Sequence, residues 1–162
     1  MGLALLSLGS NVEPDIHLAA AARALRTAFA DVVFSPVYRY VAVGFDGPDF
    51  LNAGAALHTD MTPPALNDWL HALEDANGRR RDVPRFSSRT LDIDLVFYDD
   101  WICEGPGNLR LPRPERKYAF VLQPLAAIAP GFVDPVCGQA LAELWRLHPD
   151  HASATVAEAL AL

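Results

Sequence analysis

The chain has 162 residues, of which 51% are hydrophobic and 20% are charged, and its formal net charge at pH 7 is −7. A chain of this length buries roughly 70% of the surface that its unfolded form exposes, so it can build a core without disulfides or a structural metal. Disordered and collagen-like classes are excluded, and we expect one globular domain over residues 1–162. Cys103 and Cys137 have no CxxC spacing, which argues against a zinc site or a disulfide framework and favours a cytoplasmic location.

Basic residues are concentrated in one part of an otherwise acidic chain. Residues 79–117 hold nine of the 13 basic residues and seven of the 20 acidic ones. Twelve of the 13 are arginine, which suits bidentate binding of phosphate but can also reflect a GC-rich coding sequence. The acidic remainder argues against a general nucleic-acid surface. We expect no signal peptide and no membrane span, because the apolar run 3–6 is short and no basic residue precedes it.

The first part of the chain has the pattern of a strand, a helix and two further strands. The apolar run 3–8 predicts a strand, and the Ala-rich segment 15–30 predicts a helix. Segment 32–43 is rich in β-branched and aromatic residues, and segment 50–59 is a second extended candidate. The two are expected to pair as antiparallel strands across the Gly- and Pro-containing loop 44–48.

The next helix is the best-punctuated element. Thr62 precedes Pro63, as an N-cap precedes a first-turn proline, and Gly78 follows the last residue with helical spacing. The apolar run 91–98 then predicts a strand, and one further helix is expected over 139–147. The order β-α-β-β-α-β is typical of a ferredoxin-like α+β fold, a split β-α-β antiparallel sheet with flanking helices in an α/β/α sandwich.

Two aspartates in the last of these strands are the first candidate site. Side chains alternate along a strand, so Asp92 and Asp94 should share one face while Leu91, Ile93 and Leu95 point into the core. The two carboxylates are then about 7 Å apart along the strand. Like charges repel unless a cation lies between them, and hard oxygen ligands suit Mg²⁺. The alternative is a solvated strand end with two ordinary aspartates.

A run of arginines before this pair favours the metal site. Pro84 and the Ser87-Ser88 pair indicate a loop. Phosphoryl transfer needs metal and arginine together to neutralise phosphate oxygens, so the arrangement suits a nucleoside triphosphate. No GxxxxGK[ST] motif is present, which excludes a P-loop enzyme. The arginines are Arg79, Arg80, Arg81, Arg85 and Arg89.

Four sequence blocks identify a family resemblance that extends from about residue 3 to residue 130. With them the chain resembles the 6-hydroxymethyl-7,8-dihydropterin pyrophosphokinases. The resemblance implies transfer of a pyrophosphoryl group from ATP to the hydroxymethyl group of a reduced pterin, with release of AMP, in folate biosynthesis. The blocks are Leu8-Gly9-Ser10-Asn11, Pro48-Asp49-Phe50-Leu51-Asn52-Ala53, Arg89-Thr90-Leu91-Asp92-Ile93-Asp94, and Phe120-Val121-Leu122 with Pro124-Leu125 and Ile128-Ala129-Pro130.

The same resemblance implies roles for individual residues. Asp92 and Asp94 would hold two Mg²⁺ ions between ATP and the pterin hydroxyl, and Arg79 and Arg89 would act with them on the phosphates. The implied pterin-binding residues are Val43, Phe50, Asn52 and Phe120. The implied nucleotide-binding residues are His71, Glu74, Arg81, Arg85, Arg110, Arg113 and Arg116. Without the resemblance, Asn52 could equally cap a turn and Phe120 could equally pack the core.

The segment 112–120 departs from the family pattern. Arg113 stands where the family usually has histidine, Tyr118 replaces an arginine, and the segment is one residue shorter. A divergent paralogue that binds a pterin or nucleotide with altered or lost activity is therefore an alternative. An RNA-binding ferredoxin-like module is the weakest reading, because its run of aromatic and basic residues is absent from the segment 53–56. We expect ATP and a reduced pterin as partners, no nucleic acid, no membrane, and a monomer.

Overall fold

An antiparallel sheet forms the centre of the computed structural model, which describes residues 1–42, 44–79, 82, 88–153 and 158–162. Strand β1 (Gly2–Ser10) lies between β4 (Phe50–Thr59) and β5 (Asp92–Tyr98), and both neighbours run antiparallel to it. Strands β2 (Val33–Phe34) and β3 (Tyr38–Tyr40) pair with the far edge of β4. The predicted α+β class and antiparallel sheet are confirmed.

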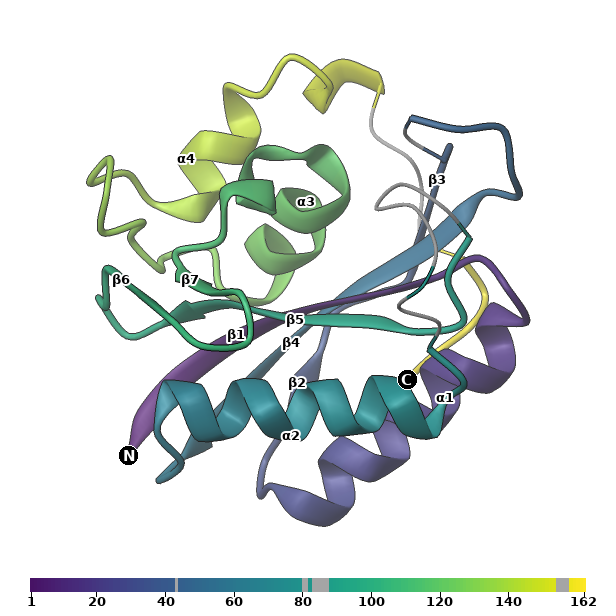
Figure 1. Ribbon diagram of the computed structural model, residues 1–162. Helices are drawn as coiled ribbons and strands as arrows, with labels where there is room; N and C mark the ends of the chain where they lie inside the picture. The colour runs from purple at the N-terminus through teal and green to yellow at the C-terminus, as the bar shows by residue number, and fades with distance from the viewer. Residues whose placement is uncertain (43, 80–81, 83–87, 154–157) are drawn as a thin grey trace.

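Helices cover both faces of this sheet (Figure 1). Helices α1 (Pro14–Ala28) and α2 (Pro63–Ala76) lie on one face, and α3 (Ala119–Ile128) and α4 (Leu141–Arg146) lie on the other. Within the described ranges, no helix is both long and apolar enough to cross a membrane.

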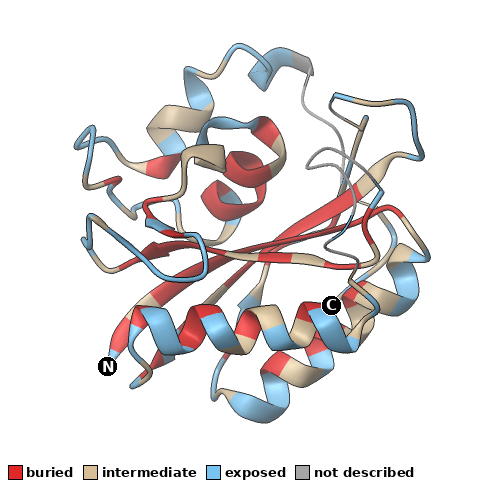
Figure 2. Cartoon of the chain, in the orientation of Figure 1, coloured by how far each residue is buried: buried red, intermediate tan, exposed pale blue. Residues whose placement is uncertain are grey.

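Each face of the sheet has its own core, and Figure 2 shows buried residues along the strands and the helix surfaces that meet them. Leu6 and Leu8 belong to the core under α1 and α2, whereas Leu5 belongs to the core under α3 and α4. This alternation follows from the period of two along a strand. A fully buried leucine contributes about 1.5–3 kcal/mol, so the register of β1 is strongly determined.

The expected strand over residues 32–43 is divided into β2 and β3. Ser35 and Pro36 lie between them, and proline has no N–H to donate to a sheet. The Ser35 hydroxyl instead accepts a hydrogen bond of 2.8 Å from the backbone N–H of Gly54. The antiparallel pairing with residues 50–59 is confirmed, because Tyr38 faces Asn52 and Tyr40 faces Phe50.

The predicted ends of α2 are found in the structure. The Thr62 hydroxyl accepts a hydrogen bond of 3.3 Å from the N–H of Ala65, which caps the first turn. The helix ends at Ala76, and Gly78 has a left-handed φ of +79°, a conformation that costs glycine little. The helix expected over 139–147 is the shorter α4.

Several elements after Tyr98 were not predicted from the sequence. Strands β6 (Cys103–Gly105) and β7 (Leu109–Leu111) form a hairpin, and the 3-10 helix η1 (Pro114–Lys117) leads into α3. Helix α3 is buried on almost every side and contains Pro124, so it shows neither an apolar stripe nor an uninterrupted helical composition.

The end of the chain packs on the face covered by α1 and α2. After the 3-10 helix η2 (His151–Ser153), the N–H of Glu158 donates to the Val37 carbonyl at 2.6 Å. Leu160 and Leu162 then pack against the core of that face. The last residues of the chain therefore act in packing.

Candidate active site

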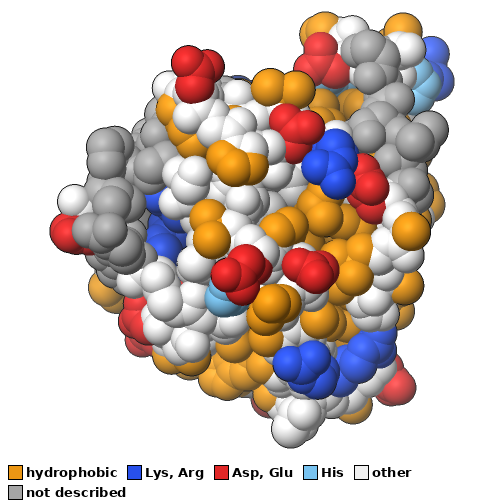
Figure 3. All heavy atoms as spheres, turned by 90° about the vertical axis from the view of Figure 1, so that its right-hand side faces the viewer, with side chains coloured by type: hydrophobic (Ala, Val, Ile, Leu, Met, Phe, Trp, Pro, Cys, Tyr) orange, Lys and Arg blue, Asp and Glu red, His pale blue; other side chains and the backbone are white. Residues whose placement is uncertain are grey.

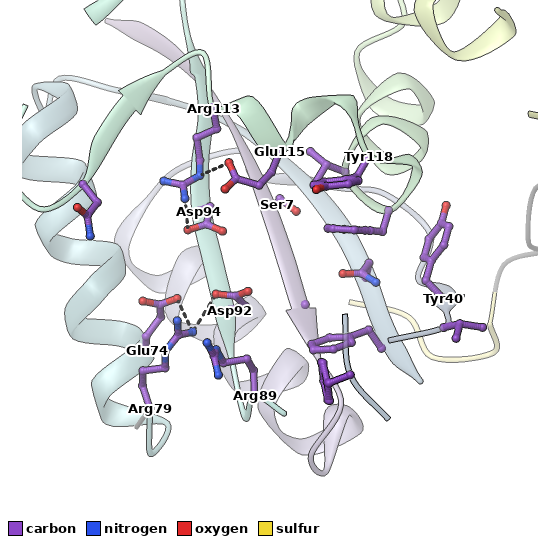
Figure 4. Close-up of a pocket in the computed structure, with 18 of the residues that line it drawn as sticks. Ser7, Tyr40, Glu74, Arg79, Arg89, Asp92, Asp94, Arg113, Glu115 and Tyr118 are labelled. Carbon is purple, nitrogen blue, oxygen red and sulfur yellow. Dashed lines mark hydrogen bonds and ion pairs between the residues drawn. The ribbon is translucent and has the colours of Figure 1, made fainter. Parts of the chain in front are cut away.

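A cavity of about 330 Å³ opens on the sheet face that carries α3. Its floor comes from three neighbouring strands, because the register places Gly9 of β1 between Asn52 of β4 and Asp92 of β5. Two residues earlier in β1, Ser7 lies beside Asp94. Residues that are 40 or more positions apart in the chain therefore form one row, and Figure 4 shows Asp92, Asp94 and Ser7 turned toward the same space.

Gly9 leaves room for the side chain of Asn52. A Cβ at Gly9 would lie 2.7 Å from Asn52 Oδ1, which is closer than carbon and oxygen can pack. Asn52 is only 5% exposed, and its Nδ2 has no hydrogen-bond partner among the described residues. A buried amide donor without a partner is costly, so Asn52 is ready to bind a polar ligand in the cavity.

Aromatic side chains line the end of the cavity near Asn52. The rings of Tyr118 and Phe120 are stacked, with centroids 5.1 Å apart and an interplanar angle of 11°. Tyr40 meets Phe120 edge to face at 6.3 Å, and Phe45 meets Phe50 in the same way at 6.4 Å. These walls suit a flat aromatic ligand. The predicted Val43 lies outside the described residues.

Three carboxylates form the other part of the cavity. Glu74, Asp92 and Asp94 each place one oxygen within 4.8 Å of the others. Arg79 Nη1 donates to Asp92 Oδ1 at 2.8 Å and lies 3.4 Å from Glu74 Oε2. Burial lowers the pKa of Arg79, but Asp92, Glu74 and Asp94 together outweigh burial and raise it. Carboxylate oxygens in this number and proximity are the ligands that Mg²⁺ prefers, so the residues fit such an ion.

Glu74 reaches this cluster from α2 on the opposite face by crossing the edge of the sheet. Strand β5 is an edge strand, and its outward Ile93 N–H donates to Glu74 Oε2 at 3.0 Å. Arg79 Nη1 donates in turn to the Leu91 carbonyl at 3.3 Å. The end of α2 thus satisfies backbone groups that an edge strand leaves unpaired, and it fixes Glu74 beside the aspartates.

Asp94 has a raised pKa within this cluster. Burial raises its pKa to about 7, nearby Asp92 adds to the effect, and Arg113 opposes it. Arg113 Nη2 lies 3.8 Å from Asp94, and its Nε lies 3.6 Å from Glu115 (Figure 4). A divalent ion would relieve the repulsion between the carboxylates more completely than this arginine does.

The Gly-Ser-Asn motif at the end of β1 connects the segments around the cavity. Asn11 accepts from the Arg89 N–H at 2.8 Å and donates through Nδ2 to the Pro48 carbonyl at 3.0 Å. Its own N–H donates to the Arg89 carbonyl at 3.1 Å. These bonds hold the backbone of Arg89 in place at the edge of the site. The Arg89 side chain is largely buried and lines the cavity.

The structure brings most, but not all, of the predicted residues together. His71, Glu74 and Arg113 line the cavity with Arg79, Arg89, the aspartates and the pterin candidates Phe50, Asn52 and Phe120. Arg81 and Arg85 lie outside the described residues.

Arg110 and Arg116 are not in this cavity, contrary to the expected grouping. Arg110 alternates with the buried Leu109 and Leu111 of β7, so its side chain points outward and pairs with Glu104 at 3.4 Å. Arg116 is held by Asp134 at 2.6 Å.

Some cavity residues were not proposed as site residues from the sequence. Ser7 could have been found, because alternation along β1 places it on the same face as Gly9. Glu115 gave no comparable signal, since its position depends on how η1 folds back over the sheet. The other cavity residues of this kind are Gly9, Phe45, Asn108, Tyr118, Val121 and the side chains of Tyr40 and Val41.

Figure 3 shows the face of the molecule that lies on the right in Figure 1. On this face, charged side chains of both signs lie among hydrophobic ones.

Comparison with known proteins agrees with this geometry. The model of the 7,8-dihydro-6-hydroxymethylpterin-pyrophosphokinase (HPPK) family matches residues 5–130. The chain belongs to this family. The 2-amino-4-hydroxy-6-hydroxymethyldihydropteridine pyrophosphokinase of Synechocystis sp. is 38% identical over 145 residues, covering 87% of this chain and 73% of the relative. The protein of the same name from Pseudomonas aeruginosa is 38% identical over 130 residues, covering 77% and 79%.

Solved structures of the HPPK family show the same fold. The crystal structure of Plasmodium falciparum HPPK-DHPS wild type with pteroate matches with a TM-score of 0.65 over 90% of this chain, at 12% identity. This chain spans 42% of the length of that protein. Identity this low supports the fold alone, and the fold expected from the order of strands and helices is the one found.

Proposed function

We infer that this HPPK-family chain transfers the pyrophosphoryl group of ATP to the hydroxymethyl group of 6-hydroxymethyl-7,8-dihydropterin and releases AMP. Relatives that carry this activity in their names match most of the chain. One observation carries the proposal: Asp92 and Asp94 line the same cavity as Asn52. The groups suited to a metal-bound phosphate and the group suited to a polar heterocycle thus meet in one space.

The aromatic end of the cavity is the proposed pterin site. A pterin is flat and carries both donors and acceptors on its edge, and the Asn52 amide offers one of each. Its unpartnered Nδ2 supports this role. Phe50 and Phe120 supply the apolar walls, which suit stacking on a ring system.

The charged end of the cavity is the proposed site for the triphosphate. Asp92 and Asp94 would hold two Mg²⁺ ions, which when bound neutralise phosphate oxygens and orient them. Arg79 and Arg89 line the same space and would balance the charge on the transferred and departing groups. His71 extends this end of the cavity along α2, where the nucleoside would lie.

The chain acts mainly by positioning in this reaction. The hydroxymethyl oxygen forms a bond to the β-phosphorus and releases its proton, and the bond from that phosphorus to the oxygen of AMP breaks, so that AMP leaves with the electron pair. Asn52 and the aromatic walls hold the attacking group in line, and the arginines stabilise charge on the phosphates. The monomeric state, the cytoplasmic location and the absence of nucleic-acid binding stay predictions.

The test is direct measurement of AMP. Purified protein with ATP, Mg²⁺ and the reduced hydroxymethylpterin should release AMP and pterin pyrophosphate in equal amounts. Asp94→Ala should abolish AMP release and retain the wild-type circular dichroism spectrum. Arg146→Gln is the matched control, because Arg146 pairs with Glu143 on the surface and should leave turnover unchanged.

Two outcomes would contradict the proposal. Turnover of Asp94→Ala at the wild-type level would remove the carboxylate pair from the mechanism. Uptake of both ligands by calorimetry without any AMP would indicate a silent pterin or nucleotide sensor on the same scaffold.

A further inference from the structure

Arg113 lies between two carboxylates of the cavity without forming a hydrogen bond to either. Its guanidinium is 3.8 Å from Asp94 and 3.6 Å from Glu115, beyond the usual hydrogen-bond distance. The side chain is only 19% exposed, and its buried Nε has no hydrogen-bond partner among the described residues. A largely buried guanidinium whose Nε donor has no partner would gain from a further acceptor in the cavity.

Arg113 also neutralises a different carboxylate of the cluster from those that Arg79 neutralises. Arg79 hydrogen-bonds to Asp92 and pairs with Glu74, whereas the arginine paired with Asp94 is Arg113. Figure 4 shows these as two separate groups of dashed lines on either side of the cluster. Arg113 therefore supplies positive charge to a carboxylate that a divalent ion would also bind.

We propose that Arg113 is an internal substitute for the divalent cation at Asp94, and that it moves from Asp94 to the nucleotide phosphates when metal and nucleotide bind together. An ion ligated to Asp94 and a guanidinium 3.8 Å from the same carboxylate repel each other, so the two compete. The planar fork of arginine suits bidentate donation to a phosphate. Glu115 keeps the guanidinium inside the cavity during the change. This inference rests on one part of the proposed function, namely that the cavity binds a nucleotide.

The competition has a thermodynamic consequence. In the nucleotide-free protein, Arg113 weakens the binding of a divalent ion. Once a phosphate has taken over the guanidinium, that opposition is gone. Metal and nucleotide should therefore each raise the affinity of the protein for the other, by the same factor in both directions.

Calorimetry of Arg113→Gln tests this directly, with Mn²⁺ as the metal and a non-hydrolysable ATP analogue as the nucleotide. Without nucleotide, the variant should bind Mn²⁺ about tenfold more tightly than wild type, because a positive charge next to Asp94 is gone. With Mn²⁺ present, it should bind the analogue about tenfold more weakly, because a charged, bidentate phosphate contact is lost. Arg146→Gln should change neither affinity.

Arg113→Lys separates the two effects and also covers the case in which the glutamine variant fails to fold. Lysine keeps the charge but lacks the fork, so Mn²⁺ affinity should stay near that of wild type while analogue affinity falls. Unchanged or weaker Mn²⁺ binding by Arg113→Gln, or a metal–nucleotide coupling as large as in wild type, would overturn the proposal. None of these titrations contains a pterin. The measurement of AMP formation by wild type therefore tests the proposed function separately from this inference.

Discussion

Asp94→Asn should make the metal-free protein more stable at alkaline pH while abolishing its activity. The pKa of Asp94 is raised from 3.8 to about 7, chiefly by burial and by the neighbouring Asp92. The folded state therefore binds this proton more tightly than the unfolded state does. For such an acid, stability is highest below the unfolded pKa and falls as pH rises from about 4 to about 7. Asparagine is neutral throughout and escapes this loss.

The size of the effect follows from the same pKa. A change of one in pKa corresponds to about 1.4 kcal/mol, so the difference between 3.8 and about 7 sets an upper limit of about 4 kcal/mol at pH 8. The Asp94 side chain is 30% exposed, and solvent screens part of this energy. We therefore expect a gain of about 1–2 kcal/mol in the free energy of unfolding.

Urea denaturation in the presence of EDTA measures this gain. The difference between variant and wild type should be largest at pH 8 and clearly smaller at pH 5, where the folded wild type carries a protonated Asp94. Equal stability of the two proteins at pH 8, or a gain that does not shrink at pH 5, would show that burial and repulsion do not destabilise the ionised Asp94 carboxylate. AMP release by the variant should be undetectable at either pH.

Three further substitutions test the geometry of the site and its support. Gly9→Ala places a Cβ 2.7 Å from Asn52 Oδ1, so pterin affinity measured by calorimetry should fall at least about tenfold while ATP affinity stays near wild type. Glu74→Gln removes the carboxylate that accepts from the Ile93 N–H and pairs with Arg79, so the free energy of unfolding measured in urea should fall by about 1–3 kcal/mol. An unchanged free energy of unfolding would show that this contact at the sheet edge is not stabilising. Thr62→Ala removes the α2 cap and should cost about 1 kcal/mol in the same assay without changing the rate of AMP release.

Much of the fold was predictable because it is encoded locally. The alternation of Asp92 and Asp94 with buried apolar residues places both carboxylates on one face, and the structure has them there. The ends of α2 follow from Thr62 and Gly78, whose conformational preferences need no tertiary partner. The division of residues 32–43 into two strands is encoded equally locally, by a proline without an N–H.

Helix α3 and the hairpin of β6 and β7 were missed for a different reason. Periodicity reveals an element that is buried on one side, and α3 is buried on almost all sides. Each hairpin strand has only three residues, too few for alternation to be recognised. Such elements form because the rest of the molecule covers them.

By itself, the sequence determined that Asp92 and Asp94 share one face of their strand, where the best-capped helix begins and ends, and the family resemblance. Only the tertiary structure decided which strands lie side by side, and hence that Gly9 separates Asn52 from Asp92. It also decided that Glu74 crosses the edge of β5, that Arg113 lies between Asp94 and Glu115, and that Arg110 points away. The physical reason is that dihedral preferences and side-chain alternation act over a few residues, whereas register, edge pairing and charge neutralisation join positions far apart in the chain.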